Sequence, residues 1–269
     1  MSDELVHLEV RGGVATITLD SPTNRNALSH RLVADLERQL AAALTDDDAR
    51  VIVLGATGPV FCAGADLKEQ RAANEAGEST ATISGRAGGG LPGILSTIYH
   101  SPKPVVARVQ GPARAGGIGL LAACDIAVGV EGATFGFSEV RLGVAPAVIS
   151  VVLLPRIGAA KARELFLTAA PFDASEAVRI GLLNAAVPAD RLDATVGDYV
   201  DALRQGAPTA LAASKELIHK VPAMAMDEAF AWTSELSARL FASVDAREGM
   251  QAFAEKRPPR WAQREEPTR

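Results

Sequence analysis

The sequence predicts an α/β fold, in which short apolar strands alternate with helices up to about residue 190. Two observations support this class. The 269 residues are 48% hydrophobic but only 4% aromatic, an aliphatic bias that suits the interior of an α/β domain. From about residue 191 the pattern turns helical throughout. We therefore expect a mixed α/β body over residues 1–190 and a helical region over residues 191–269.

The N-terminal residues predict a β-hairpin and then a helix. Residues 5–10 and 14–19 alternate apolar and polar side chains on either side of Gly12 and Gly13, as hairpin strands do. After a polar loop, apolar side chains recur at helical spacing at Leu32, Val33, Leu36, Leu40 and Leu44. The acidic residues 46–48 then indicate a solvated turn.

The middle of the chain predicts further strands at 50–56, 103–109, 125–130 and 134–137. A helix is expected to begin just after Gly64, and another covers 91–100. Residues 72–90 between them are small, polar and glycine-rich. We interpret them as a surface loop, either a plain linker or a lid over a neighbouring site.

The C-terminal residues predict consecutive helices. Pro208 fits the first turn of one helix, and an apolar stripe follows it over residues 211–221. Residues 225–243 and 245–256 predict two more helices. No fixed-period repeat is visible.

Composition excludes several function classes. The net charge of −5, the isoelectric point near 5.5 and the scarcity of aromatic residues argue against a nucleic-acid partner. Cys62 and Cys124 are too few for a disulfide framework, and the four histidines are scattered, so we expect no metal site. Both cysteines lie in apolar surroundings and are interpreted as buried, inert thiols.

No targeting or membrane segment is expected. The first ten residues lack the basic start and the apolar stretch of a signal peptide. The apolar runs around 118–130 and 142–154 are interrupted by Asp125 and Pro146, which leaves both too short to cross a membrane. We therefore expect a cytoplasmic protein with no membrane partner.

A glycine cluster at residues 116–119 fits the G-x-G-x-x-G/A pattern of a dinucleotide-binding turn. Such a turn needs its first glycine at the very end of the preceding strand. Here the strand ends near Val109, and the seven residues QGPARAG intervene before Gly117. The spacing therefore argues against a nicotinamide or flavin dinucleotide.

An oxyanion hole suits the same glycines better. Gly116 and Gly117 lie at the start of an apolar helical run, where backbone N–H groups have no intrahelical acceptor. Gly64 and Ala65 have the same relation to the helix that follows them, with Asp66 as its N-terminal residue. Two such turns can each direct one N–H to a single developing oxyanion. Two independent structural turns are the alternative.

Three segments, by their sequence and their order along the chain, resemble the enoyl-CoA hydratase/isomerase (crotonase) superfamily. They are FCAGADLKE at 61–69, GPARAGGIGLLAACDIAVG at 111–129 and FGFSEVRLGVAPAVIS at 135–150. The resemblance extends from the N-terminal hairpin to the C-terminal residues 245–257. It implies a crotonase-like spiral of ββα units over residues 1–190 and a helical trimerisation region over 191–269, assembled as a homotrimer or as a hexamer built from two trimers.

The resemblance also implies roles for individual residues. The backbone N–H groups of Ala65 and Gly116 would bind the thioester oxygen of an acyl-CoA. Lys256 would reach the CoA of a neighbouring subunit. CoA is part of the substrate, so no separate cofactor is implied. The positions expected to lie along the CoA are Arg25, Ala27, Leu28, Ala63, Asp66, Leu67 and Lys68.

The same resemblance makes Glu139 the catalytic acid and base. Hydratases of this superfamily that use two glutamates have the other one at a position that is Gly119 in this sequence, so that glutamate is missing here. Hydration of a 2-enoyl-CoA needs water activation and proton delivery, whereas moving a double bond needs only one base. The segment around Glu139 resembles 3-methylglutaconyl-CoA-type hydratases, so we predict an enoyl-CoA hydratase. A Δ3-Δ2-enoyl-CoA isomerase and a non-catalytic acyl-CoA-binding relative are the alternatives. Arg114 is either a partner for a substrate carboxylate or a solvated loop residue.

Overall fold

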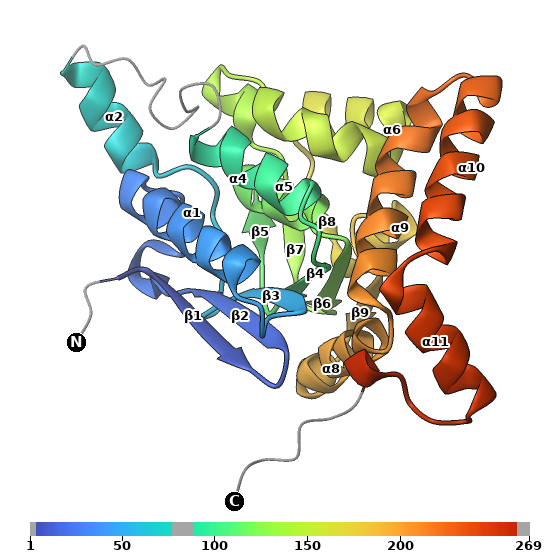
Figure 1. The fold of residues 1–269 in the computed structure, drawn as a ribbon. Helices are drawn as coiled ribbons and strands as arrows, with labels where there is room; N and C mark the ends of the chain where they lie inside the picture. The colour runs from blue at the N-terminus through green and yellow to red at the C-terminus, as the bar shows by residue number, and fades with distance from the viewer. Residues whose placement is uncertain (1–3, 77–88, 263–269) are drawn as a thin grey trace, which may run out of the picture.

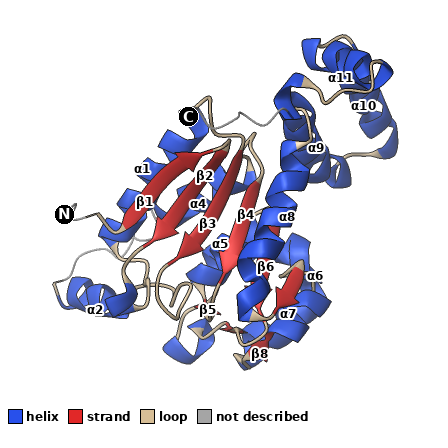
Figure 2. Cartoon of the chain, turned by 90° about the horizontal axis from the view of Figure 1, so that it is seen from below, coloured by secondary structure: helices blue, strands red, loops and turns tan. Residues whose placement is uncertain are grey.

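The computed structural model describes residues 4–76 and 89–262, and its central element is a six-stranded sheet in the order β1-β2-β3-β4-β6-β9. Figures 1 and 2 show helices on both faces of this sheet and a helical C-terminal arm beside it. The predicted α/β class is therefore confirmed.

The predicted N-terminal hairpin is formed by β1 (Val6–Arg11) and β2 (Val14–Leu19), which pair antiparallel. The predicted helix is α1 (His30–Thr45), and the side chain of Ser29 caps it by accepting the N–H of Leu32. Its apolar stripe packs on β1 and β2, so the hairpin and α1 bury one another.

The centre of the sheet is parallel and apolar except for Arg108 of β4. β3 (Val51–Ala56) is buried at every residue and pairs with β2 and β4 (Val105–Val109). β6 (Ile126–Val130) and β9 (Ala185–Val187) complete the sheet. Strands covered on both faces read as continuous aliphatic runs, which is the pattern that predicted β3, β4 and β6, whereas the three-residue β9 was not predicted.

Two strands of a second, three-stranded sheet come shortly before the predicted site residues Gly116 and Glu139 in the chain. This sheet consists of β5 (Ala113–Arg114), β7 (Thr134–Gly136) and β8 (Phe172–Asp173), in which β5 and β7 are parallel. The sequence predicted only β7, because β5 and β8 are two residues long and show no periodicity. β5 matters for the site, since it leads directly into α5 (Gly116–Ala123).

Helices cover both faces of the large sheet. In Figure 1, α1, α4 (Gly90–Tyr99) and α5 lie above the sheet, and α8 (Leu192–Arg204) lies below it against β3, β4 and β6. α6 (Ala147–Thr168) packs on α4 and α5 and is interrupted at Gly158, where φ is 74°. The short α7 (Ala174–Arg179) connects β8 to β9.

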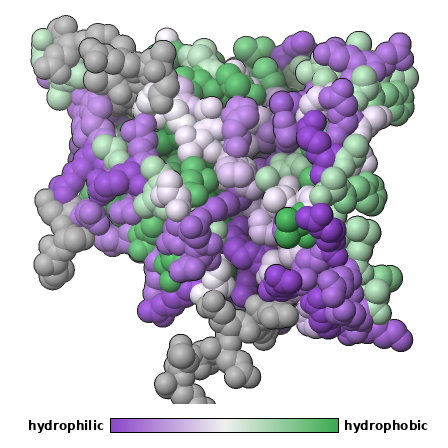
Figure 3. All heavy atoms as spheres, viewed as in Figure 1, coloured by the Kyte–Doolittle hydropathy of each residue, from purple (hydrophilic) through white to green (hydrophobic). Residues whose placement is uncertain are grey.

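The C-terminal helices α9 (Pro208–Lys220), α10 (Met226–Phe241) and α11 (Val244–Ala254) form an arm beside the sheet. α9 begins at Pro208, as predicted. Figure 3 shows apolar surface along the edge of the molecule that carries α10 and α11. Several large apolar side chains of the arm are exposed, namely Ile218, Met226, Phe230, Phe241, Val244, Met250 and Phe253.

The predicted loop over residues 72–90 was wrong at its start. Helix α2 (Leu67–Glu75) continues to Glu75, and α4 already begins at Gly90. Residues 77–88, which make up most of the predicted loop, lie outside the described residues. Within residues 4–76 and 89–262, no helix is both long and apolar enough to cross a membrane.

Candidate active site

The two glycine turns identified in the sequence lie against each other. Gly64 has a left-handed φ of 86°, and a Cβ built on it would lie 3.0 Å from the Cβ of Ala115 and 3.1 Å from the carbonyl oxygen of Arg114. The N–H of Arg114 also donates to the carbonyl of Cys62 at 3.0 Å. Only a glycine at position 64 permits this approach.

The backbone N–H groups of Ala65 and Gly116 follow directly on this contact. Gly116 is the first residue of α5, so its N–H has no acceptor within the helix. No described residue accepts a hydrogen bond from either N–H. Ala115 adopts φ 47° and ψ −116°, a conformation that costs an alanine energy and sets the direction of the Gly116 N–H. The structure thus brings two unpaired donors to one place.

Glu139 reaches the same region through β7. The N–H of Ala115 donates to the carbonyl of Gly136 at 3.2 Å, and Glu139 begins a 3₁₀ turn three residues further on. One carboxylate oxygen of Glu139, Oε2, is buried and accepts no hydrogen bond from the described residues. Burial raises the pKa of Glu139, because it disfavours the charged form. A partly buried carboxyl with one unpaired oxygen and a raised pKa is suited to proton transfer.

Gly119 lies one turn into α5 and faces apolar side chains. A Cβ at this position would lie 2.5 Å from Cγ2 of Ile149 and 3.5 Å from Cδ1 of Leu95. The space that a longer side chain would need at Gly119 is therefore taken by α6 and α4. Sequence reasoning noted the missing glutamate but missed Ile149, which only the helix packing reveals.

The glycine cluster has a packing role that differs from a dinucleotide-binding turn. A Cβ on Gly117 would lie 2.7 Å from the carbonyl oxygen of Cys62, and one on Gly116 would lie 2.7 Å from Cδ1 of Leu28. The strand that precedes the cluster is the short β5 rather than β4. These glycines are needed so that the neighbouring loops can approach α5.

The segments predicted to lie along CoA are adjacent. The N–H of Ala63 donates to the carbonyl of Arg25 at 3.1 Å, and an isolated parallel bridge pairs Leu28 with Ala65. Ala27 and Leu28 are buried, whereas Arg25 has a left-handed φ of 61°. The first segment therefore runs alongside the turn that carries the Ala65 N–H.

Asp66, Leu67 and Lys68 form the start of α2. One carboxylate oxygen of Asp66 accepts the N–H groups of Lys68 at 3.0 Å and Glu69 at 3.3 Å, so Asp66 acts as the helix N-cap. Leu67 and Lys68 are exposed. The Lys68 ammonium group is therefore free to meet a ligand at the molecular surface.

Two residues that the sequence singled out are not part of this cluster. Arg114 donates from its guanidinium to the carbonyl and the hydroxyl of Thr134, so it is half-buried rather than a solvated loop residue, and its contact with a substrate carboxylate stays a prediction. Lys256 is exposed just beyond α11, and Figures 1 and 2 show α11 and α2 at opposite ends of the molecule. Within one chain, Lys256 does not approach the residues above.

The surroundings of the two cysteines confirm the prediction that their thiols are buried. Cys62 and Cys124 are buried, and burial raises the pKa of each thiol to about 12. Among the described residues, no group of three or more histidine, cysteine or acidic side chains could hold a metal ion.

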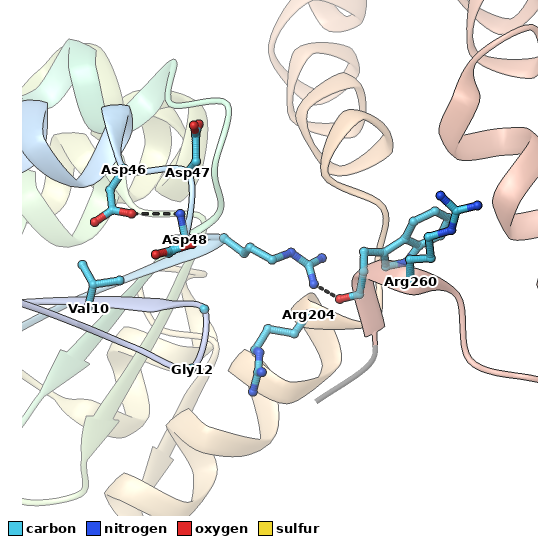
Figure 4. Close-up of a pocket in the computed structure, with 10 residues that line it drawn as sticks. Val10, Gly12, Asp46, Asp47, Asp48, Arg204 and Arg260 are labelled. Carbon is cyan, nitrogen blue, oxygen red and sulfur yellow. Dashed lines mark hydrogen bonds between the residues drawn. The ribbon is translucent and has the colours of Figure 1, made fainter. Parts of the chain in front are cut away.

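A cavity of about 1020 Å³ lies elsewhere, between the tip of the hairpin and the C-terminal residues. Figure 4 shows Asp46, Asp47 and Asp48 on one side of it and Arg204 and Arg260 on the other. Its lining contains neither glycine turn and does not include Glu139. This cavity is therefore separate from the glycine turns and from Glu139.

The fold and these paired turns define a member of the enoyl-CoA hydratase/isomerase family. The sequence profile of that family matches residues 9–264 of the chain. The chain therefore belongs to this family of enzymes, and its crotonase fold is confirmed.

Known proteins agree with this assignment. The chain is 33% identical over 255 residues to a short-chain-enoyl-CoA hydratase of Clostridium acetobutylicum, covering 94% of this chain and 95% of the relative. It is 35% identical to the mevalonyl-coenzyme A hydratase of Aspergillus fumigatus, covering 92% and 91%. The crystal structure of an enoyl-CoA hydratase from Shewanella pealeana superimposes with a TM-score of 0.89 at 32% identity, covering 96% of each chain.

Proposed function

We propose that this protein is an enoyl-CoA hydratase, which adds water across the double bond of a 2-enoyl-CoA thioester. The observation that carries the proposal is Glu139, a partly buried carboxyl with an unpaired oxygen and a raised pKa, in the 3₁₀ turn that follows the strand bonded to Ala115. The names of the Clostridium and Aspergillus relatives, both hydratases of CoA thioesters, support it.

In the proposed mechanism the thioester oxygen accepts the N–H groups of Ala65 and Gly116. The Glu139 carboxylate takes a proton from water, and the resulting hydroxide bonds to C3 of the substrate. The electron pair of the double bond moves onto the thioester, whose enolate oxygen the two N–H groups stabilise. The Glu139 carboxyl then delivers the proton to C2. One carboxyl can serve both steps if the water lies between it and the double bond.

An isomerase is the second candidate, and Gly119 favours it. Ile149 and Leu95 fill the space beside Gly119, so the described residues supply no second carboxylate there. Moving a double bond from C3–C4 to C2–C3 needs only one base that carries a proton between C4 and C2. The same N–H pair would stabilise the same enolate.

For the CoA portion we propose the exposed Lys68 together with Arg25, Ala27, Leu28, Ala63, Asp66 and Leu67. No separate cofactor is needed for this acid–base chemistry. We also propose that residues 191–269 form a trimerisation region around the exposed apolar side chains of α9 and α10, giving a homotrimer or hexamer in which Lys256 reaches a neighbour's CoA. The cytoplasmic location is part of the same proposal.

A spectrophotometric assay separates the candidates. Purified protein is incubated in turn with crotonyl-CoA and with a 3-enoyl-CoA, and the ultraviolet absorbance of the conjugated enoyl thioester is followed. Loss of absorbance from crotonyl-CoA supports the hydratase, and a gain from the 3-enoyl substrate supports the isomerase. Binding of acyl-CoA without turnover of either substrate would make the protein a non-catalytic acyl-CoA-binding relative.

A further inference from the structure

We propose that Asn26 is a positioning residue that holds the Ala65 turn of the oxyanion hole in place. The inference rests on the proposed function, because it assumes that the Ala65 N–H binds a thioester oxygen. Asn26 is completely buried and lies outside the residues that the proposed mechanism uses.

The amide side chain of Asn26 forms hydrogen bonds with the loop between β3 and the Ala65 turn. Its Nδ2 donates to the carbonyl of Thr57 at 2.9 Å and to the carbonyl of Val60 at 2.8 Å. Its Oδ1 accepts the N–H of Ser21 at 2.7 Å. A single side chain thus uses both of its N–H donors and its oxygen, and two of the three bonds hold the loop that leads to Ala65.

The backbone around Asn26 adds a second connection to the same turn. Arg25 and Asn26 have left-handed φ values of 61° and 52°, a conformation that asparagine tolerates better than most residues. Leu28 lies two residues after this bend, and its N–H donates to the carbonyl of Gly64 at 2.7 Å. Asn26 therefore sets the position of the strand-like segment that orients the Ala65 N–H.

No other described side chain makes both of the hydrogen bonds that the Nδ2 of Asn26 donates. Gln110 also donates to the carbonyl of Val60, but at 3.4 Å, and no other described side chain donates to the carbonyl of Thr57. A partly buried carbonyl that loses its donor moves or takes up water. Because a displacement of about 1 Å can cost about 10²-fold in rate, a small shift of the turn weakens the oxyanion hole.

The test compares wild-type protein with Asn26→Asp, which keeps the size, the backbone tolerance and the Oδ1 acceptor but removes the amide donors. Butanoyl-CoA with an isotope-labelled thioester carbonyl is bound to each, and infrared difference spectra report the carbonyl stretch. We expect a shift to lower frequency in the wild-type complex and a smaller shift in the variant. With a turned-over substrate, kcat should fall at least about tenfold while KM changes little. An Asn26→Asp protein whose carbonyl shift and kcat equal those of the wild type overturns the proposal.

Two further proteins keep the test decisive. Asn26→Gly also accepts the left-handed backbone and replaces Asn26→Asp if the aspartate prevents folding. Asp35→Ala is the matched control, because Asp35 is likewise buried and binds a backbone N–H, that of Leu5, away from the Ala65 turn. The control should lose stability but keep the full carbonyl shift. A wild-type complex without any shift would refute the oxyanion hole itself, whereas a shift without hydration would refute only the hydratase reaction.

Discussion

Ile149 occupies the space beside Gly119, so closely that a Cβ on the glycine would lie 2.5 Å from its Cγ2. No real side chain sits at that distance from a neighbour, and Ile149 is itself buried against the core. Any side chain at position 119 would therefore force Ile149, and with it the α5–α6 contact, to shift. The apolar contact explains why Glu139 is the one carboxyl that we assign to proton transfer.

We expect Gly119→Ala to lower the free energy of unfolding by about 1–3 kcal/mol, because the added methyl overpacks the α5–α6 contact. Combining it with Ile149→Ala should relieve the clash, so the two changes together cost less than the sum of their separate effects. Chemical denaturation of the four proteins measures this coupling.

Gly197→Ala is the matched control, since Gly197 lies inside α8 and a Cβ there would meet no atom within 4 Å. Alanine suits a helix better than glycine by about 1 kcal/mol, so this change should leave stability equal or higher. If Gly119→Ala proves as harmless as the control, the close contact with Ile149 is absent.

Much of the fold could be predicted because its signals are local. The aliphatic runs of β3, β4 and β6 and the apolar stripe of α1 are visible as periodicity in the chain. β5 escaped prediction because two residues carry no period. The end of α2 was misplaced because its later residues are small and polar, and their helical state does not depend on an apolar stripe.

Some residues of the candidate site could likewise be predicted from the sequence, and others could not. The glycine turns stand out in the sequence because each precedes the start of a helix, whereas Glu139 is identified only through the resemblance of its segment to the crotonase family. Asn26 and Ile149 do not stand out, since their roles depend on the loop and the helix that fold against them. The engagement of Arg114 with Thr134 likewise required the pairing of β5 with β7.

Glu139→Gln should abolish most turnover and also stabilise the protein. The loss of the proton-transfer group is expected to lower kcat by about 10²–10⁴-fold. Burial raises the pKa of Glu139 in the folded state above its ordinary value of 4.5, so folding favours the protonated form. The cost of the buried charge is absent below pH 4.5 and grows as the pH rises through the folded-state pKa. The variant should therefore be more stable than the wild type at pH 7 but not at pH 4.

Steady-state kinetics and denaturation at both pH values test this prediction. Glu131→Gln serves as the control, because Glu131 is an exposed turn residue whose loss should change neither quantity. Equal activity of Glu139→Gln and wild type would contradict the mechanism. A stability difference of the same size at pH 4 and pH 7 would contradict the buried-charge explanation.

The exposed apolar face of α9 and α10 should hold the proposed oligomer together. Ile218 is 69% exposed and Phe230 66% exposed, more apolar surface than a solitary helical arm should present to water. We expect Phe230→Glu to shift the protein toward the monomer in size-exclusion chromatography with light scattering. Ser237→Glu adds the same charge to an exposed position of α10 and should leave the oligomer intact. A wild-type protein that is already monomeric would refute the proposed trimer.

The buried ion pair between Lys215 and Asp125 should attach α9 to the sheet. Their side chains are 9% and 20% exposed and lie 2.6 Å apart, and the ammonium group of Lys215 also donates to the carbonyl of Lys103. Lys215→Met removes one partner and leaves a carboxylate in a poorly solvated place, so we expect a loss of about 3–5 kcal/mol. Adding Asp125→Asn should recover part of this loss, because the amide carries no charge and can still accept the N–H of Val105.

Chemical denaturation of the single and double variants measures both effects. Arg71→Met is the control, because Arg71 and Glu75 form an exposed pair on α2 at 2.8 Å, and such surface pairs contribute about 0–1 kcal/mol. A loss for Lys215→Met no larger than that of the control would mean that α9 is held by apolar packing alone. In that case Asp125→Asn would bring no recovery, since there would be no stranded charge to remove.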